Sequence, residues 1–171
     1  MSVSRKIATA FLFLIFASWL FVSCRQKNET EIIAALVVDM AVRAEKRDAA
    51  GLIANLADDF RDYQGFDRSR IAEMLQEYFS RFRGIVVHVL ASRIVIEDAR
   101  NAAVVTEVSL SSGAAQAFRK LIRFTGENYR FQFRLRKNGR WLITEGKWEY
   151  VAVESLFPES LKILRELFPN L

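Results

Sequence analysis

The stretch Tyr129–Tyr150, YRFQFRLRKNGRWLITEGKWEY, decides the fold, because it reads as two strands joined at Asn138-Gly139. Asn-Gly between alternating runs favours a two-residue type I′ turn, and a turn of that length fixes the register of the hairpin. The pairs expected on one face are Leu135–Leu142, Phe133–Thr144, Phe131–Gly146 and Tyr129–Trp148. The pairs expected on the other face are Arg136–Trp141, Arg134–Ile143, Gln132–Glu145 and Arg130–Lys147. The first face is predicted to be aromatic and buried.

Segments on both sides of this hairpin predict a mixed α and β domain. Residues 85–96 and 102–110 are β-branched runs separated by a polar turn, which is typical of two further strands. Apolar residues recur at helical spacing from Glu31 to Leu56, with a break near residues 48–51, and again over Arg68–Phe82. Residues 114–124 fit either a short helix or a strand. Pro158 suits the first turn of a short C-terminal helix.

This order of elements resembles a known domain family. The helices with Leu56-Ala57-Asp58-Asp59-Phe60, and the hairpin segment FQFRLRKNGRWLI at residues 131–143, are similar to a nuclear transport factor 2-like (cystatin-like cone) domain over about residues 31–150. The resemblance implies an α+β fold in which N-terminal helices cover the concave face of a strongly curved antiparallel sheet. It also implies that the convex face often forms a dimer interface. Because this fold hosts isomerases, dehydratases, ligand binders and interaction modules, the resemblance implies no single activity.

The N-terminus has the three parts of an export signal. Ser4-Arg5-Lys6 is basic, residues 7–22 are apolar, and Ser23 leads into Cys24, the only cysteine of the chain. The junction resembles a bacterial lipobox with Phe21 in place of the usual leucine, which implies that Cys24 receives diacylglycerol and palmitate. We therefore expect a lipoprotein signal peptide at 1–23, a tether at 24–30 and the domain with its C-terminal helix at 31–171.

The alternative for the N-terminus is an uncleaved signal anchor. Both interpretations place the domain in the cell envelope, attached to a membrane and facing the periplasm or the exterior. With one cysteine, an intramolecular disulfide is excluded.

Charge gives a mild bias towards anionic partners. The chain carries a net charge of +5. The basic residues between 119 and 140 are Arg119, Lys120, Arg123, Arg130, Arg134, Arg136, Lys137 and Arg140, against the single acid Glu127. Since export argues against a nucleic acid, the run indicates anionic lipid headgroups, an acidic protein, an anionic small ligand or simply a solvated face.

Candidate catalytic residues are few. His88 is the only histidine, in an apolar strand, and Asp62 and Tyr63 lie near the expected mouth of the cone with Asp58 and Asp59. Each has an ordinary structural interpretation, as a satisfied strand residue or a solvated helix end. No set of ligands with metal spacing exists, and no cofactor is expected. The aromatic residues are expected to be mainly core, with any residual cavity forming a hydrophobic ligand pocket.

The leading hypothesis is a membrane-anchored, extracytoplasmic, non-catalytic module for ligand binding or protein assembly. Its interface is expected on the convex face, with Trp141 and Ile143 among Arg130, Arg134 and Arg136, and with a second copy or another protein as the partner. The alternative is a small enzyme of the isomerase or dehydratase kind that uses His88 or an aspartate in the cone. A component of a secretion machine is the third hypothesis.

Overall fold

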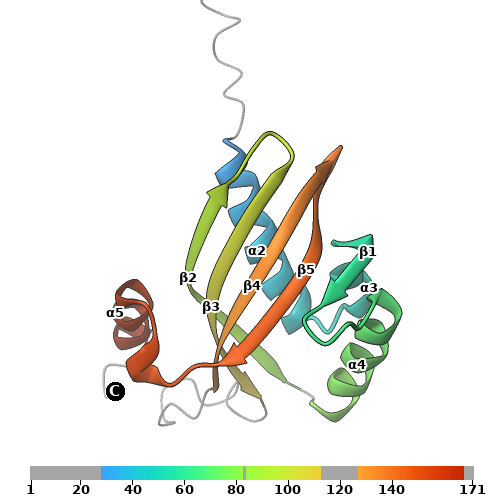
Figure 1. Ribbon diagram of the computed structural model, residues 1–171. Helices are drawn as coiled ribbons and strands as arrows, with labels where there is room; N and C mark the ends of the chain where they lie inside the picture. The colour runs from blue at the N-terminus through green and yellow to red at the C-terminus, as the bar shows by residue number, and fades with distance from the viewer. Residues whose placement is uncertain (1–27, 83, 113–126, 168–171) are drawn as a thin grey trace, which may run out of the picture.

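The computed structural model describes residues 28–82, 84–112 and 127–167. Five strands form one curved sheet in the order β1-β5-β4-β3-β2, with α2 packed along one face and α5 against the other (Figure 1). The helices are α2 (Glu29–Glu45), α3 (Ala49–Ile53), α4 (Arg68–Arg81), the 3-10 turn η3 (Val153–Ser155) and α5 (Pro158–Leu167). The strands are β1 (Leu56–Asp62), β2 (Ile85–Ile96), β3 (Asn101–Ser112), β4 (Glu127–Asn138) and β5 (Arg140–Tyr150). This arrangement confirms the predicted α+β fold; the leader and residues 114–124 lie outside the described residues.

Capping side chains set the helix boundaries. The Asn28 side chain accepts a hydrogen bond from the Thr30 amide at the start of α2, and Asp67 accepts one from the Arg70 amide at the start of α4. The first helical segment ends at Glu45, and Asp48 caps the separate short helix α3 through the Gly51 amide. The predicted break near residues 48–51 therefore begins a few residues earlier.

Strand β1 is the element that the sequence did not indicate. It runs parallel to β5 at the edge of an otherwise antiparallel sheet, so the sheet is mixed. An irregularity between Leu56 and Arg61 lets Asp58 and Asp59 stay exposed while Leu56 and Phe60 enter the core. In the sequence, the two adjacent aspartates resemble the end of a helix. The strand becomes evident only in the structure, where the residues on either side of them are buried.

The hairpin register differs from the predicted one. Lys137 pairs with Trp141 and Asn138 with Arg140 around Gly139, which has a left-handed φ of 69°. Leu135 consequently pairs with Ile143, one residue away from the predicted partner, and a one-residue slip moves every side chain of a strand to the other face. Trp141 and Ile143 therefore face the core.

A bulge then restores the predicted aromatic face. The register shifts again between Arg134 and Leu135, so that Phe133 pairs with Gly146 and Phe131 with Trp148. The ring of Phe60 lies 3.4 Å from the position that a Gly146 Cβ would take, so this ring packs directly over the glycine. The aromatic residues thus share one face, as predicted, with partners two positions further along β5.

Separate apolar clusters hold the helices on the two faces. Ile33 and Val37 of α2 pack on the concave face against residues that include Leu135, Trp141 and Ile143. A second cluster joins Leu52 of α3 and Phe79 of α4 to Ile85 of β2. On the convex face, Leu164 of α5 packs against Leu90, Val151 and Leu156. The helices α2, α3 and α4 therefore enclose the concave side, and α5 covers part of the convex side.

Candidate functional site

Cross-strand neighbours place Asp62 inside the cone. Asp62 lies opposite Gly146, Gly146 opposite Phe133, and Phe133 opposite Val104, in one row across the sheet. Directly opposed residues point to the same face, and Val104 belongs to the core cluster under α2. Asp62 therefore points into the concave side, where only 7% of it is exposed.

The two oxygens of the Asp62 carboxylate have different surroundings. Oδ1 accepts hydrogen bonds from the backbone amides of Gln64, at 2.9 Å, and Phe66, at 2.7 Å. These bonds close the turn that ends β1, in which Gly65 has a left-handed φ of 85°. Oδ2 is buried and has no hydrogen-bond partner among the described residues. A buried acceptor without a partner is costly, which makes this oxygen the candidate polar group on the concave side.

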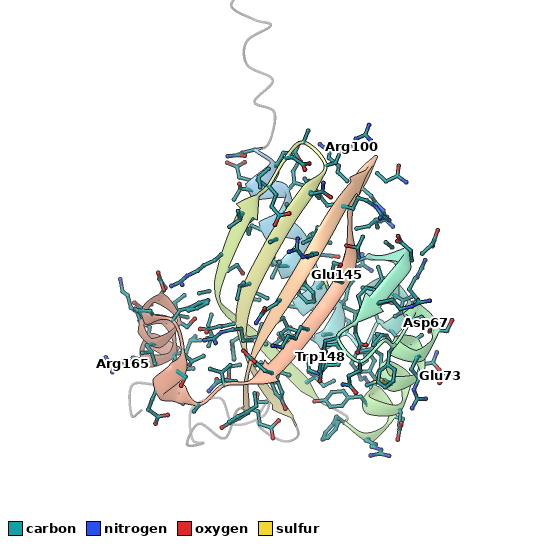
Figure 2. The ribbon with its side chains drawn as sticks, viewed as in Figure 1. Asp67, Glu73, Arg100, Glu145, Trp148 and Arg165 are labelled. Atoms are coloured by element: carbon teal, nitrogen blue, oxygen red, sulfur yellow. The ribbon has the colours of Figure 1, made fainter. Side chains whose placement is uncertain are left out.

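Aromatic rings continue the concave face beyond Asp62. Phe131 stacks on Phe133 at 5.8 Å between ring centroids, Tyr129 lies 6.4 Å from Phe131, and Tyr63 meets Trp148 edge to face at 5.3 Å. Figure 2 shows Trp148 on β5, on the side of the molecule where α4 lies. Phe131, Phe133, Tyr129 and Trp148 are only half-buried. Nearer the start of α2 the same face is filled, with Leu135 and Ile143 at 3% and 1% exposure.

Two phenols lie at the far end of this aromatic wall. The Tyr129 hydroxyl donates a 2.6 Å hydrogen bond to Glu127, which together with burial raises the pKa of Tyr129 to about 12. Burial, followed by the charge of Glu127, also raises the pKa of Tyr78. Both tyrosines therefore stay protonated at neutral pH and do not act as bases there.

His88 lies on the other face of the sheet. Its neighbours Val87 and Val89 pack into the helix-covered clusters, so the alternation of the strand turns His88, opposite Ser109, towards the convex side. The sheet consequently separates His88 from Asp62, and the two side chains cannot act on one ligand.

The predicted acidic site at the cone mouth is not assembled. Asp58 forms an ion pair with Arg68, and Asp59 is bound by Arg136 at 2.7 Å, both on the surface. The hydrogen bond from Arg136 is the main cause that lowers the pKa of Asp59. Of the candidate residues, Asp62 enters the cone and Tyr63, 52% exposed, lies at its rim.

The residues that were predicted to form a convex interface lie partly in the core and partly on the surface. Trp141 and Ile143 are 4% and 1% exposed in the main core, so the expectation that they form the apolar centre of a convex interface is wrong. Arg134 and Arg136 do lie exposed, as the alternation predicted. Whether the convex face contacts another chain stays a prediction, now without an apolar centre at these positions.

Arg130 is committed to an intramolecular site on the convex face. The Glu107 carboxylate, which has no exposed surface, accepts bonds from Arg130 at 2.6 and 3.0 Å and from the Phe157 amide at 2.8 Å. The Phe157 ring lies under Arg93, whose guanidinium carbon is 3.6 Å from the ring centroid. These contacts fix the chain between β5 and α5 on the sheet. In the sequence, the feature that indicates this site is Glu107, the single acidic residue within the apolar run 102–110.

The described part of the basic run is largely paired. Arg134 contacts Glu97, Arg136 contacts Asp59, and Lys137 contacts Glu29 at 2.6 Å. A shallow convex groove of about 540 Å³, lined in part by Arg134, Arg136 and Glu145, therefore holds opposite charges close together. Arg119, Lys120 and Arg123 lie outside the described residues.

Within the described ranges, no group of three or more histidine, cysteine or acidic side chains is placed to hold a metal ion. No helix in those ranges is long and apolar enough to cross a membrane.

Comparisons with known proteins establish the fold. No family model and no curated protein matches the sequence. A domain of unknown function with a cystatin-like fold from Nostoc punctiforme matches with a TM-score of 0.60 and 14% identity, over 83% of this chain and 95% of that chain. A putative scytalone dehydratase from Novosphingobium aromaticivorans matches with a TM-score of 0.60 and 15% identity, over 72% and 85%.

Bd1075 of Bdellovibrio bacteriovorus is a longer chain, of which this protein spans 40%, at a TM-score of 0.58 and 16% identity over 70% of this protein. Solved structures described as cystatin-like or NTF-2-like are among the matches. The chain therefore has the cystatin-like fold of nuclear transport factor 2-like domains. A shared fold at such identities carries no activity with it.

Proposed function

We propose that this chain is a non-catalytic binding module, held outside the cytoplasm by lipid on Cys24, that takes up a small apolar molecule in its cone. One observation carries the binding part. The concave face is packed shut near the start of α2, whereas Phe131, Phe133, Tyr129 and Trp148 remain half-buried towards the other end. Half-covered aromatic rings beside a few polar groups are typical of small-molecule sites.

Ligand binding is favoured over the other predicted uses of the surface. The convex face lacks the apolar centre that Trp141 and Ile143 were expected to give it, because both residues are in the core. An apolar ligand is favoured over an anionic one, since Arg134, Arg136 and Lys137 already have acidic partners.

Catalysis is the alternative, and Asp62 is the observation that favours it. A buried carboxylate with an unpaired oxygen can accept a proton from a bound substrate. A binding role is favoured because His88 lies on the other face of the sheet, and because the Tyr129 hydroxyl already donates its hydrogen bond to Glu127. Neither His88 nor Tyr129 is therefore placed to exchange a proton with a substrate bound at Asp62.

The test is calorimetric titration of the full chain in detergent with 2-naphthylmethanol, a neutral ring compound, against a blank of the same detergent. We expect one site per chain. We expect Phe131→Ala to raise the Kd roughly tenfold, which corresponds to a loss of about 1.4 kcal/mol of binding free energy. Val95→Ala, at a residue 59% exposed on the other face, is the control and should bind as the unmodified chain does. Absence of binding, or equal affinities for the two variants, would contradict the proposal.

A further inference from the structure

The unpaired oxygen of Asp62 points to the chemistry of the ligand as well as to its place. Oδ2 has no exposed surface and no described hydrogen-bond partner, although Oδ1 of the same carboxylate has two. The carboxylate is fixed by those two backbone amides, so it cannot rotate Oδ2 towards water without breaking the turn at the end of β1. A ligand that reaches this oxygen must donate a hydrogen bond to it.

The nearby rings favour a positive charge at the same place. Phe133 lies opposite Gly146, the strand neighbour of Asp62, and Trp148 is two residues further along β5, with the Tyr63 ring perpendicular to its own. The faces of aromatic rings carry partial negative charge and attract cations, most strongly when water is excluded. The Asp62 carboxylate and the aromatic faces therefore both favour a positively charged group on the ligand.

An anion is disfavoured at this position for the same reasons. The nearest basic residue in sequence, Arg61, is exposed, and its guanidinium donates to the Phe60 carbonyl. An anionic group next to Asp62 would thus meet a like charge without compensation from Arg61.

We propose that Asp62, Trp148 and Phe133 form a subsite for the ammonium group of a small organic cation, whose apolar body lies along Phe131. This inference rests on the proposed function, because it names the class of ligand that the cone takes. The ammonium donates to Asp62 Oδ2 and lies against the aromatic faces, while the remainder of the ligand covers the half-buried rings.

The experiment compares three probes of similar shape: 2-naphthylmethylammonium, 2-naphthylmethanol and 2-naphthoate. Each is titrated calorimetrically into the full chain in detergent, with protein-free detergent as the blank. The ammonium should bind on the order of tenfold to a hundredfold more tightly than the alcohol, which is the range of a charge-assisted hydrogen bond. The naphthoate should bind most weakly.

Two variants of the same strand assign the preference. Asp62→Asn keeps the shape and an oxygen for the two amides but removes the charge, and it should abolish the preference for the ammonium while the alcohol still binds. Asp58→Asn, whose side chain is 98% exposed, is the matched control and should keep the preference.

The outcomes separate this inference from the proposed function. If the alcohol binds but the ammonium shows no advantage, or if Asp62→Asn keeps the advantage, the cation subsite is wrong and the binding module stands. If none of the three probes binds, both are wrong.

Discussion

Glu107 illustrates how one buried side chain can hold a segment in place. Its carboxylate satisfies Arg130 and the Phe157 amide with no exposed surface of its own. Removal of Glu107 leaves the Phe157 amide without its acceptor and leaves Arg130 with only the more distant Glu149, at 3.6 Å, as a charge partner. We therefore expect Glu107→Ala to lower the free energy of unfolding by about 3 kcal/mol or more, measured by urea denaturation. Glu145→Ala, 3.7 Å from Arg134 and 67% exposed, should change it by no more than about 0.5 kcal/mol.

A double-substitution cycle checks this explanation. Arg130→Met alone leaves Glu107 buried without its charge partner, whereas Arg130→Met combined with Glu107→Met removes both charges. The double variant should be more stable than Arg130→Met. Additive losses would show that Glu107 and Arg130 act independently.

Tyr129 gives a prediction for alkaline pH. Its pKa is raised from 10.0 to about 12, first by the hydrogen bond to Glu127 and then by burial. Because the folded state favours the neutral phenol, this contribution to stability is complete below pH 10 and is lost as the pH rises from 10 towards 12. Ultraviolet titration should show one tyrosine ionising near pH 12 that is missing in Tyr129→Phe.

The Glu127→Gln variant separates the two causes of this shift. It should lower the pKa of Tyr129 towards 10.0, since the charged acceptor is the larger cause. An unchanged titration would assign the whole shift to burial instead.

At the scale of elements, periodicity predicted most of the structure and failed at two local irregularities. The strand β2 and the helix α4 were expected at the residues where they occur, because long runs of one period need no further information. Asn138-Gly139 marked the hairpin correctly but suggested the wrong loop length. The bulge beside Arg134 has no signature in the sequence, since the alternation of aromatic or apolar and polar residues from Phe131 to Arg136 runs through it unbroken.

Helix α5 should detach more readily than the rest of the molecule. Its contact with the sheet rests largely on Leu164, 1% exposed, in a cluster separate from the main core. We expect Leu164→Ala to raise amide hydrogen exchange over Pro158–Leu167 and to leave the exchange of α2 unchanged, as measured by mass spectrometry. Leu167→Ala on the same helix, at 44% exposure, should have little effect. Equal acceleration in α2 would mean that α5 and the main core unfold together.

At the scale of the whole molecule, the sequence predicted the fold more fully than the site. Asp62 was named as a candidate from its position near the cone mouth, but its isolation from Asp58 and Asp59 depends on which face of β1 each occupies. His88 was left open between two faces, and only the packing of Val87 and Val89 decides between them. Burial of a polar atom without a partner is a property of three-dimensional packing, so no pattern of residues could show it.

The predicted lipidation of Cys24 gives a testable location for the molecule. If Cys24 is acylated, Cys24→Ser should abolish incorporation of labelled palmitate and move the protein from the membrane fraction to the soluble fraction. Ser23→Ala keeps a small residue before the cysteine and should behave as the unmodified chain. Retention of Cys24→Ser in the membrane would favour an uncleaved signal anchor.

The contact between Glu29 and Lys137 at the start of α2 has a mechanical consequence if the domain is tethered through Cys24. Cys24 and Asn28 are four residues apart, so a lipid on Cys24 would lie within roughly 14 Å of the first turn of α2 and would transmit a pull to it. There Glu29 binds Lys137 of β4 and the Trp141 indole of β5, each at 2.6 Å. Neither strand is at an edge of the sheet. If Cys24 is acylated, a pull on that anchor is thus shared between α2 and two interior strands of the sheet, and we expect this to oppose opening of the domain from its N-terminal end.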